Sequence, residues 1–132
     1  MAVGIQVVNV LLVEDEFLIC DMMADALTRH GFEVHAAMNA DQALQLLKCG
    51  APCDILLTDL NLGAGLDGVA LAKLVREMRP ELPVVYVSGR YNRIDEFQAV
   101  PGARFVSKPC NTDRLCAMLS ESVAGQGRVT PS

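Results

Sequence analysis

The chain has no tryptophan, few aromatic residues, no cluster of basic side chains and no long apolar segment. Its 11 Lys and Arg against 16 Asp and Glu give a formal net charge of -5, so it lacks the basic surface that contacts to nucleic-acid phosphates require. No apolar stretch approaches the roughly 20 residues of a membrane-spanning helix, and the first residues do not read as a secretion signal. We therefore expect no nucleic-acid binding, no membrane association and a cytoplasmic location.

Paired metal-binding cysteines are also absent. The chain has five cysteines, an odd number, and only Cys49 and Cys53 lie near each other in sequence. A structural zinc site would need closely spaced pairs, so we expect reduced thiols in a reducing compartment. The two histidines, His30 and His35, show no metal or triad spacing, and we expect both at the surface.

What the chain does have is enough apolar residues for one domain. At 132 residues and 52% hydrophobic, it is long enough for a real core and too short for two ordinary domains. We expect one domain over residues 1–124. Residues 125–132 have the glycine-containing polar composition of a flexible tail.

Strand and helix signals alternate along this domain. After the first strand, Ile19, Met22, Met23, Ala26 and Leu27 repeat at helical spacing and predict one buried stripe. The pattern is weakest over residues 91–99, where we expect a short fourth helix. The five strands are predicted at residues 7–13, 32–37, 54–58, 83–87 and 103–107.

Helix boundaries carry their own signals. Asn39 and Gln42 have the spacing of a capping box, and Asn111 is placed to cap the last helix. Gly31 supplies a left-handed stop to the first helix.

Strands joined by helices predict parallel right-handed crossovers, and hence an α/β class with helices on both faces of the sheet. The first, third and fourth strands are nearly continuous apolar runs, as expected for central strands. The second alternates and the fifth contains Arg104 and Ser107, so both belong at edges. This predicts a single doubly wound (βα)5 domain of the flavodoxin-like type, with strand order 2-1-3-4-5.

Polar residues follow the carboxyl ends of four of these strands. They are Glu14 and Asp15 after the first strand, Asp59 after the third, Ser88 after the fourth and Lys108 after the fifth. In the predicted order the first and third strands are neighbours, so the three acids should converge. Clustered carboxylates repel one another, and a divalent cation would offset that repulsion. Mg²⁺ suits an open site of oxygen ligands that meets a phosphate, with Mn²⁺ as an alternative.

These separated motifs resemble the receiver domain of two-component response regulators, from about Val7 to Val123. The strand order is itself a property of that family, so it agrees with the resemblance without supporting it independently. The resemblance implies that Asp59 is the phosphoacceptor. It also implies a set of metal ligands: Glu14, Asp15, Asp59 and the backbone carbonyl of Asn61.

The resemblance implies further roles beyond the metal. Ser88 and Lys108 would bind the phosphoryl group, Phe105 would be the switch aromatic, and the peptide bond between Lys108 and Pro109 would be cis. Arg90 would line the approach of the attacking water and tune the lifetime of the phosphate. The loop after Asn61 is one residue longer than usual in the family and lacks its proline.

The function implied is a signalling switch rather than an enzyme. A histidine kinase or a histidine phosphotransfer protein would donate the phosphoryl group to Asp59 in a Mg²⁺-dependent reaction. A downstream protein would read the surface formed by the helix over 91–99, the strand over 103–107 and the last helix. The sequence does not decide whether the chain forms a homodimer. It also does not decide between a stand-alone regulator and a receiver module of a hybrid histidine kinase or longer regulator.

Two other classes also place an aspartate at a strand end. A phosphohydrolase with an aspartyl-phosphate intermediate would do so, but Asn61 stands where such enzymes tend to have a second aspartate. A non-phosphorylated interaction module would not need the intact set of acids, hydroxyl and ammonium. Ser88 as a nucleophile is disfavoured because no glycine stands two residues before it and no histidine is placed as its base.

Overall fold

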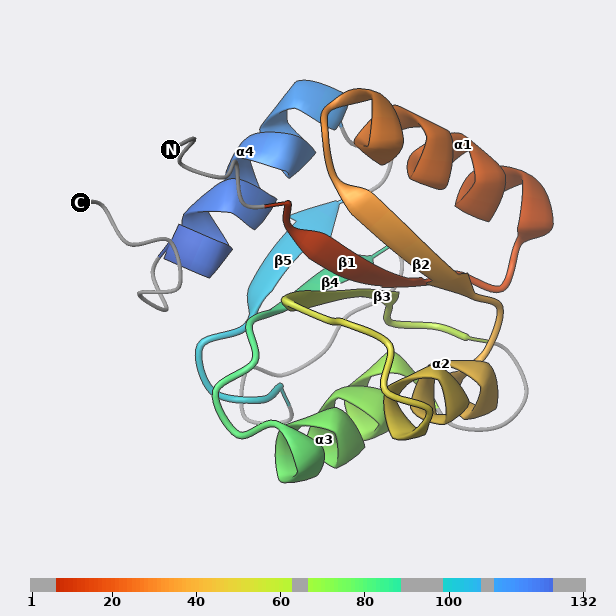
Figure 1. Cartoon of the computed structure of the whole chain (residues 1–132), viewed down its shortest axis with the longest axis vertical. Coiled ribbons are helices and arrows are strands. Elements are labelled where there is room, and N and C mark those ends of the chain that lie inside the picture. Colours follow the sequence, from red (N-terminus) through yellow and green to blue (C-terminus); the bar gives the residue numbers. More distant parts are fainter. Residues whose placement is uncertain (1–6, 63–66, 89–98, 108–110, 125–132) are drawn as a thin grey trace, which may run out of the picture.

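In the computed structural model of the chain, the described residues form a single five-stranded parallel sheet with two of the described helices on each face (Figure 1). The structure describes residues 7–62, 67–88, 99–107 and 111–124. In chain order the elements are β1 (Asn9–Val13), α1 (Phe17–Arg29), β2 (Glu33–Ala37), α2 (Ala40–Lys48), β3 (Ile55–Asp59), α3 (Gly68–Met78), β4 (Val84–Ser88), β5 (Arg104–Ser107) and α4 (Thr112–Ala124).

The strand order is β2-β1-β3-β4-β5, and every neighbouring pair is parallel. This confirms the predicted α/β class and the order 2-1-3-4-5. The central strands are buried in the manner expected of parallel strands covered on both faces, apart from the half-buried Asn9 at the start of β1 and Ser88, whose side chain is not described. By contrast, β2 and β5 include exposed residues.

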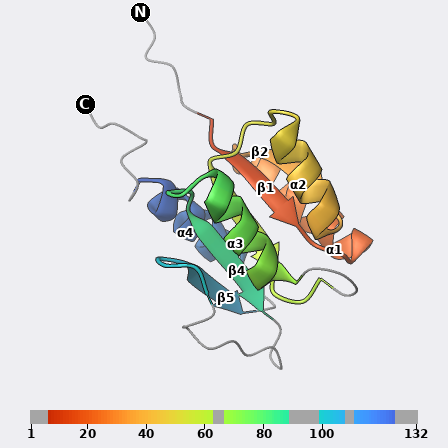
Figure 2. The same ribbon diagram turned by 90° about the horizontal axis from the view of Figure 1, so that it is seen from below.

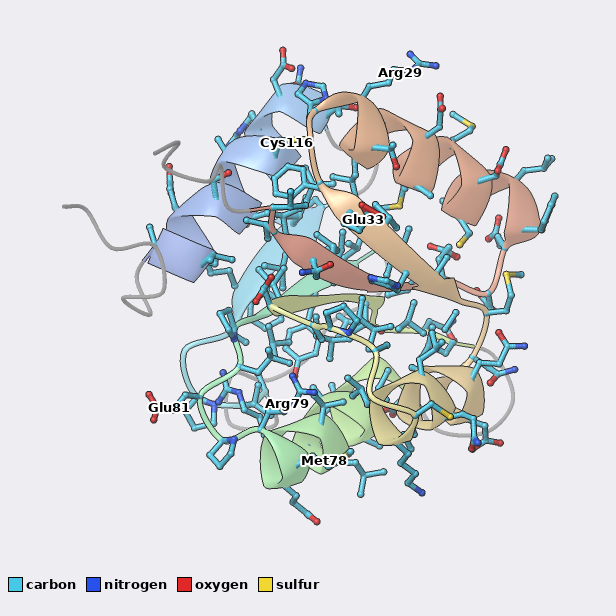
Figure 3. All side chains as sticks on the ribbon, in the orientation of Figure 1. Arg29, Glu33, Met78, Arg79, Glu81 and Cys116 are labelled. Atoms are coloured by element: carbon cyan, nitrogen blue, oxygen red, sulfur yellow. The ribbon has the colours of Figure 1, made fainter. Side chains whose placement is uncertain are left out.

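Two apolar cores fill the space between the sheet and its helices. α1 and α4 cover one face, and α2 and α3 cover the other, as seen from two directions in Figures 1 and 2. Alternate residues of the central strands β1, β3 and β4 enter opposite cores, so that Leu56 and Tyr86 join the α2–α3 core while Leu57 and Val87 join the α1–α4 core. Figure 3 shows Cys116 on α4, where it is buried in the latter core.

The stripe predicted for α1 is partly wrong. Met22 is 70% exposed, and the residues of α1 that join the core are Cys20, Met23, Ala24 and Leu27. This set has the same i, i+3, i+4, i+7 spacing, so two overlapping faces of the helix satisfy the pattern. Packing against β1 and α4 decides which of these two faces is buried. The buried face is the one that contains Cys20, although its side chains are less hydrophobic.

The capping signals correspond to observed interactions. The Asn39 side chain accepts from the Gln42 amide at 2.8 Å, while Gln42 Oε1 accepts from the backbone N–H of Met38 at 2.8 Å. Asn111 Oδ1 accepts from the amide of Arg114 at 3.1 Å and so caps α4. Gly31 has φ 93°, which is the predicted left-handed stop after α1.

The fourth helix expected over 91–99 and the tail over 125–132 fall on residues outside the described ranges, apart from Ala99. Among the helices that are described, none has the length and apolar character to cross a membrane.

Candidate functional site

Three carboxylates meet where the carboxyl ends of β1 and β3 lie side by side. Glu14 and Asp15 follow β1, and Asp59 is the last residue of β3, which pairs with β1 from Val10↔Ile55 to Val13↔Thr58. One oxygen from each carboxylate lies within 4.8 Å of the others. The structure thus brings together the three acids that the strand-end pattern selects.

The three acids differ in their surroundings. Glu14 is 1% exposed, and its Oε2 accepts from the backbone N–H of Glu16 at 3.1 Å. Asp59 is 5% exposed, and its Oδ1 accepts from the backbone N–H of Asn61 at 3.0 Å. Asp15 is exposed to solvent. The backbone therefore orients two of the carboxylates, and the third stands at the mouth of the site.

Electrostatics makes this cluster a candidate cation site. Two unit negative charges about 4–5 Å apart repel by roughly 3–4 kcal/mol at an effective dielectric constant of about 20. A magnesium ion fits the donor set, since it prefers hard oxygen ligands and retains waters in an open site. Glu14, Asp15 and Asp59 supply such oxygens, two of them already held by backbone N–H groups.

The start of α3 packs directly against the backbone of Asp59. The N–H of Gly68 donates to the carbonyl of Leu60 at 2.9 Å, and a Cβ at Gly68 would lie 2.1 Å from the carbonyl oxygen of Asp59. Asp67 caps this helix by accepting from the amide of Ala70 at 2.8 Å. Only glycine allows the helix to begin so close to the site. The strand-end pattern did not indicate this role of Gly68, although an Asp-Gly pair before an apolar helix is a usable signal.

The structure describes only some of the remaining predicted site residues. Ser88, the last residue of β4, pairs with Ser107 in the β4–β5 ladder, and Asp59 pairs with Val87 in the β3–β4 ladder. The carboxyl ends of β3 and β4 therefore lie side by side. Asn61 is exposed directly after Leu60. Arg90, Lys108 and Pro109 lie outside the described residues, as does the Ser88 side chain, and so do residues 63–66 of the longer loop.

Phe105 makes an aromatic contact that the sequence pattern did not predict. It is 37% exposed, and its ring centroid lies 5.2 Å from that of Tyr86, with 32° between the ring planes. The two residues are direct partners in the β4–β5 ladder. Since β-sheet partners share a face, the register itself predicts the pair once the strand order is known.

The cysteines that the structure describes form no disulfide with one another. Burial raises the pKa of the Cys20 thiol, and the nearby negative charges of Glu14 and Asp21 raise it further. Burial raises the pKa of Cys53 to about 11. Both thiols are therefore protonated and unreactive near neutral pH.

A doubly wound parallel sheet with an acidic cation site at the carboxyl ends of β1 and β3 defines the class of this protein, since such folds place ligands where the strand order reverses. Residues 10–120 match the family model of the response regulator receiver domain. The chain belongs to this family.

Relatives of known sequence and structure agree. The chain is 33% identical over 117 residues to the nitrogen assimilation regulatory protein NtrX of Azorhizobium caulinodans, covering 87% of this chain and 26% of NtrX. It therefore spans about a quarter of that relative. Among solved structures, it superposes on a response regulator receiver protein from Sinorhizobium medicae with a TM-score of 0.85 and 29% identity, covering 93% of this chain and 99% of the other. The receiver domain of NtrX from Brucella abortus gives a TM-score of 0.76 and 36% identity, covering 87% and 98%.

Proposed function

We propose that the chain is a phosphorylation-activated switch that accepts a phosphoryl group on Asp59 from a histidine kinase or a histidine phosphotransfer protein. The observation that supports this most directly is the cluster of Glu14, Asp15 and Asp59 at adjacent strand ends of a receiver domain. The domain catalyses only its own phosphorylation and dephosphorylation, and it acts as a signalling module rather than an enzyme on other substrates.

In this proposal an oxygen of the Asp59 carboxylate attacks the phosphorus of a phosphohistidine. The new O–P bond gives an aspartyl phosphate, and the N–P bond to the donor histidine breaks. The backbone N–H of Asn61, which donates to Asp59 Oδ1, orients the carboxylate for this attack. Glu14 and Asp15 serve the cation rather than the phosphorus.

Glu14, Asp15, Asp59 and the backbone carbonyl of Asn61 would hold Mg²⁺, which when bound supplies positive charge against the carboxylates and the incoming phosphoryl oxygens. Mn²⁺ prefers the same oxygen ligands. The hydroxyl of Ser88 and the ammonium of Lys108 would bind other oxygens of the phosphoryl group, and Arg90 would tune the lifetime of the phosphate. The peptide bond between Lys108 and Pro109 would be cis.

The output would be a change of surface at the edge formed by β5. Phosphorylation adds roughly two negative charges and three acceptor oxygens to a site that was already acidic. Ser88 would move toward this group and Phe105 would turn inward, changing the face formed by residues 91–99, β5 and α4. A downstream protein, or a second copy of the chain, would read that face.

The donor would dock on the outer surface of α1, next to the acids. Phe17, Leu18 and Met22 are 68%, 73% and 70% exposed, and α1 begins two residues after Asp15. The same side of the helix includes the exposed acid Asp21. A partner with an apolar helix face flanked by basic residues would fit this surface and bring its phosphohistidine to Asp59.

The working unit in this proposal is residues 1–124, with residues 125–132 as a flexible tail, in the cytoplasm. The whole protein in which the receiver acts can be a stand-alone regulator or a longer one, including a hybrid histidine kinase.

Replacement of the acceptor tests the proposal. Wild-type protein incubated with acetyl phosphate and Mg²⁺ should gain one phosphoryl mass, and Asp59→Asn should gain none, because an amide cannot form the acyl phosphate. Intact-protein mass spectrometry measures both. Asp41→Asn, an exposed carboxylate on α2, is the matched control and should phosphorylate normally. Phosphate uptake by Asp59→Asn would refute the acceptor, and turnover of phosphate esters without a kinase would favour a phosphohydrolase.

A further inference from the structure

Tyr86 is the largest side chain that the described core buries completely, and it lies in the strand that ends at Ser88. It contacts two parts of the chain that are far from each other in sequence. One is Phe105, the next residue across the β4–β5 ladder, and the other is Val100.

The hydroxyl of Tyr86 accepts a hydrogen bond from the backbone N–H of Val100 at 3.3 Å. Burial raises the pKa of this hydroxyl, so it stays protonated near neutral pH. Val100 is 5% exposed, and its carbonyl accepts from the N–H of Ala103 at 3.2 Å, one residue before β5 begins. The Tyr86 hydroxyl therefore holds Val100, the first residue of the turn that leads into β5.

The ring of Tyr86 supports Phe105 from the buried side. Phe105 is 37% exposed, so it is in contact with the Tyr86 ring and also partly with solvent. Because the Val100 bond and full burial hold the Tyr86 ring, that ring would be a rigid surface over which Phe105 turns in the proposed switch. Thr58, the residue before Asp59, is the ladder partner of Tyr86 on its other side.

We propose that Tyr86 is a positioning residue that couples the state of Asp59 to Phe105 and to the entry into β5. Its ring sets the resting orientation of Phe105, and its hydroxyl keeps Val100 in register with β4. A change at the carboxyl ends of β3 and β4 then reaches both residues through one side chain. This inference rests on the proposed phosphorylation of Asp59.

Two substitutions separate the two contacts. Tyr86→Phe keeps the ring and removes only the hydroxyl, so the Val100 bond is lost. Tyr86→Leu also removes the aromatic contact with Phe105. Loss of one such hydrogen bond changes the ratio of two conformations by about fivefold, the ratio equivalent to ~1 kcal/mol.

The test is NMR of the full chain with Mg²⁺ and then beryllofluoride, a mimic of the phosphoryl group. The chain has four phenylalanines, so ring-labelled Phe105 can be resolved together with the Val100 amide. In the wild type we expect these signals to shift in step with those of Asn61, which borders the site. In Tyr86→Phe the response of Val100 should shrink while Asn61 responds fully, and in Tyr86→Leu the responses of both Val100 and Phe105 should shrink.

Val85→Ala is the control for a general loss of stability. Val85 is fully buried on the opposite face of β4, in the α1–α4 core. We expect it to lower the urea midpoint and to leave the responses of Phe105 and Val100 intact. A reduced response in this control would overturn the proposal, because it would trace the effect to stability alone.

The outcomes distinguish a failure of the proposed role of Tyr86 from a failure of the proposed phosphorylation of Asp59. A wild-type chain in which even Asn61 fails to respond overturns the proposed function and the role of Tyr86 together. A normal wild-type response that persists at Phe105 and Val100 in both Tyr86 variants overturns the role of Tyr86 alone. Tyr86→Phe changes no buried volume beyond one oxygen, so it keeps the test decisive if Tyr86→Leu does not fold.

Discussion

At the scale of single residues, Gly68 is as necessary for the geometry of the site as the three acids are. The first residue of α3 lies so close to the backbone of Asp59 that only a residue without a side chain fits there. The obstructing atoms are backbone atoms of Asp59 and Leu60, 2.1–3.0 Å from where a Cβ would lie. A flexible side chain could move aside, but these backbone atoms can move only by shifting Asp59, the proposed phosphoacceptor.

We expect Gly68→Ala to lower the free energy of unfolding by about 1–3 kcal/mol and to slow phosphorylation by acetyl phosphate, since the added methyl displaces Asp59. Urea unfolding and mass spectrometry measure the two effects. Gly31→Ala is the matched control, because Gly31 has φ 93° with nothing within 4 Å of its Cβ position. It should lose about 1 kcal/mol of stability and phosphorylate at the normal rate. Equal rates in both variants would show that Gly68 does not position Asp59.

At the scale of elements, the end of α1 is joined to the start of α4 by a histidine. His30 follows α1, and its Nδ1 lies 2.9 Å from the carbonyl oxygen of Ala26 while its Nε2 lies 3.1 Å from Asp113 Oδ1. Both partners are acceptors, and a neutral imidazole has only one N–H to donate. The geometry therefore favours the imidazolium, which donates from both nitrogens.

The pKa of His30 is accordingly raised, first by the carbonyl of Ala26 and then by Asp113. A raised pKa in the folded state stabilises the fold below the unfolded value of about 6.5, and this contribution is lost as the pH rises through the folded value. We expect Asp113→Asn to lower the pKa of His30, measured from its imidazole proton shifts by NMR. His35 contacts Asn9 instead, so the chemical shifts of its imidazole protons at a fixed pH are the internal control and should not move. An unaltered pKa of His30 in this variant would contradict the contact.

At the scale of the whole molecule, the acidic site and the exposed apolar part of α1 lie next to each other. A small phosphodonor needs only the site, whereas a protein donor must also cover the surface around it. The side chains of Phe17, Leu18 and Met22 are mostly in solvent, so replacing one of them removes little buried packing.

We therefore expect Leu18→Ser to slow phosphotransfer from the histidine kinase that best phosphorylates the wild type, by about tenfold, as for loss of an interface contact of ~1.4 kcal/mol. Phosphorylation by acetyl phosphate should not change. Met78→Ser, at an exposed apolar position on α3 labelled in Figure 3, is the matched control and should behave as wild type with both donors. A loss with acetyl phosphate as well would show that Leu18 supports the site rather than the partner.

The sequence by itself determined the class of fold, the strand order and the group of acids. These follow from local rules: apolar runs form buried strands, polar residues end them, and parallel crossovers bring the ends together. The tertiary structure alone decided that Glu14 is buried while Asp15 is exposed, that Cys20 rather than Met22 faces the core, and that Tyr86 joins Phe105 to Val100. The spacing of apolar residues leaves two overlapping faces of a helix, or two sides of a strand, as candidates for burial. Which of them is buried depends on packing against elements that are distant in sequence.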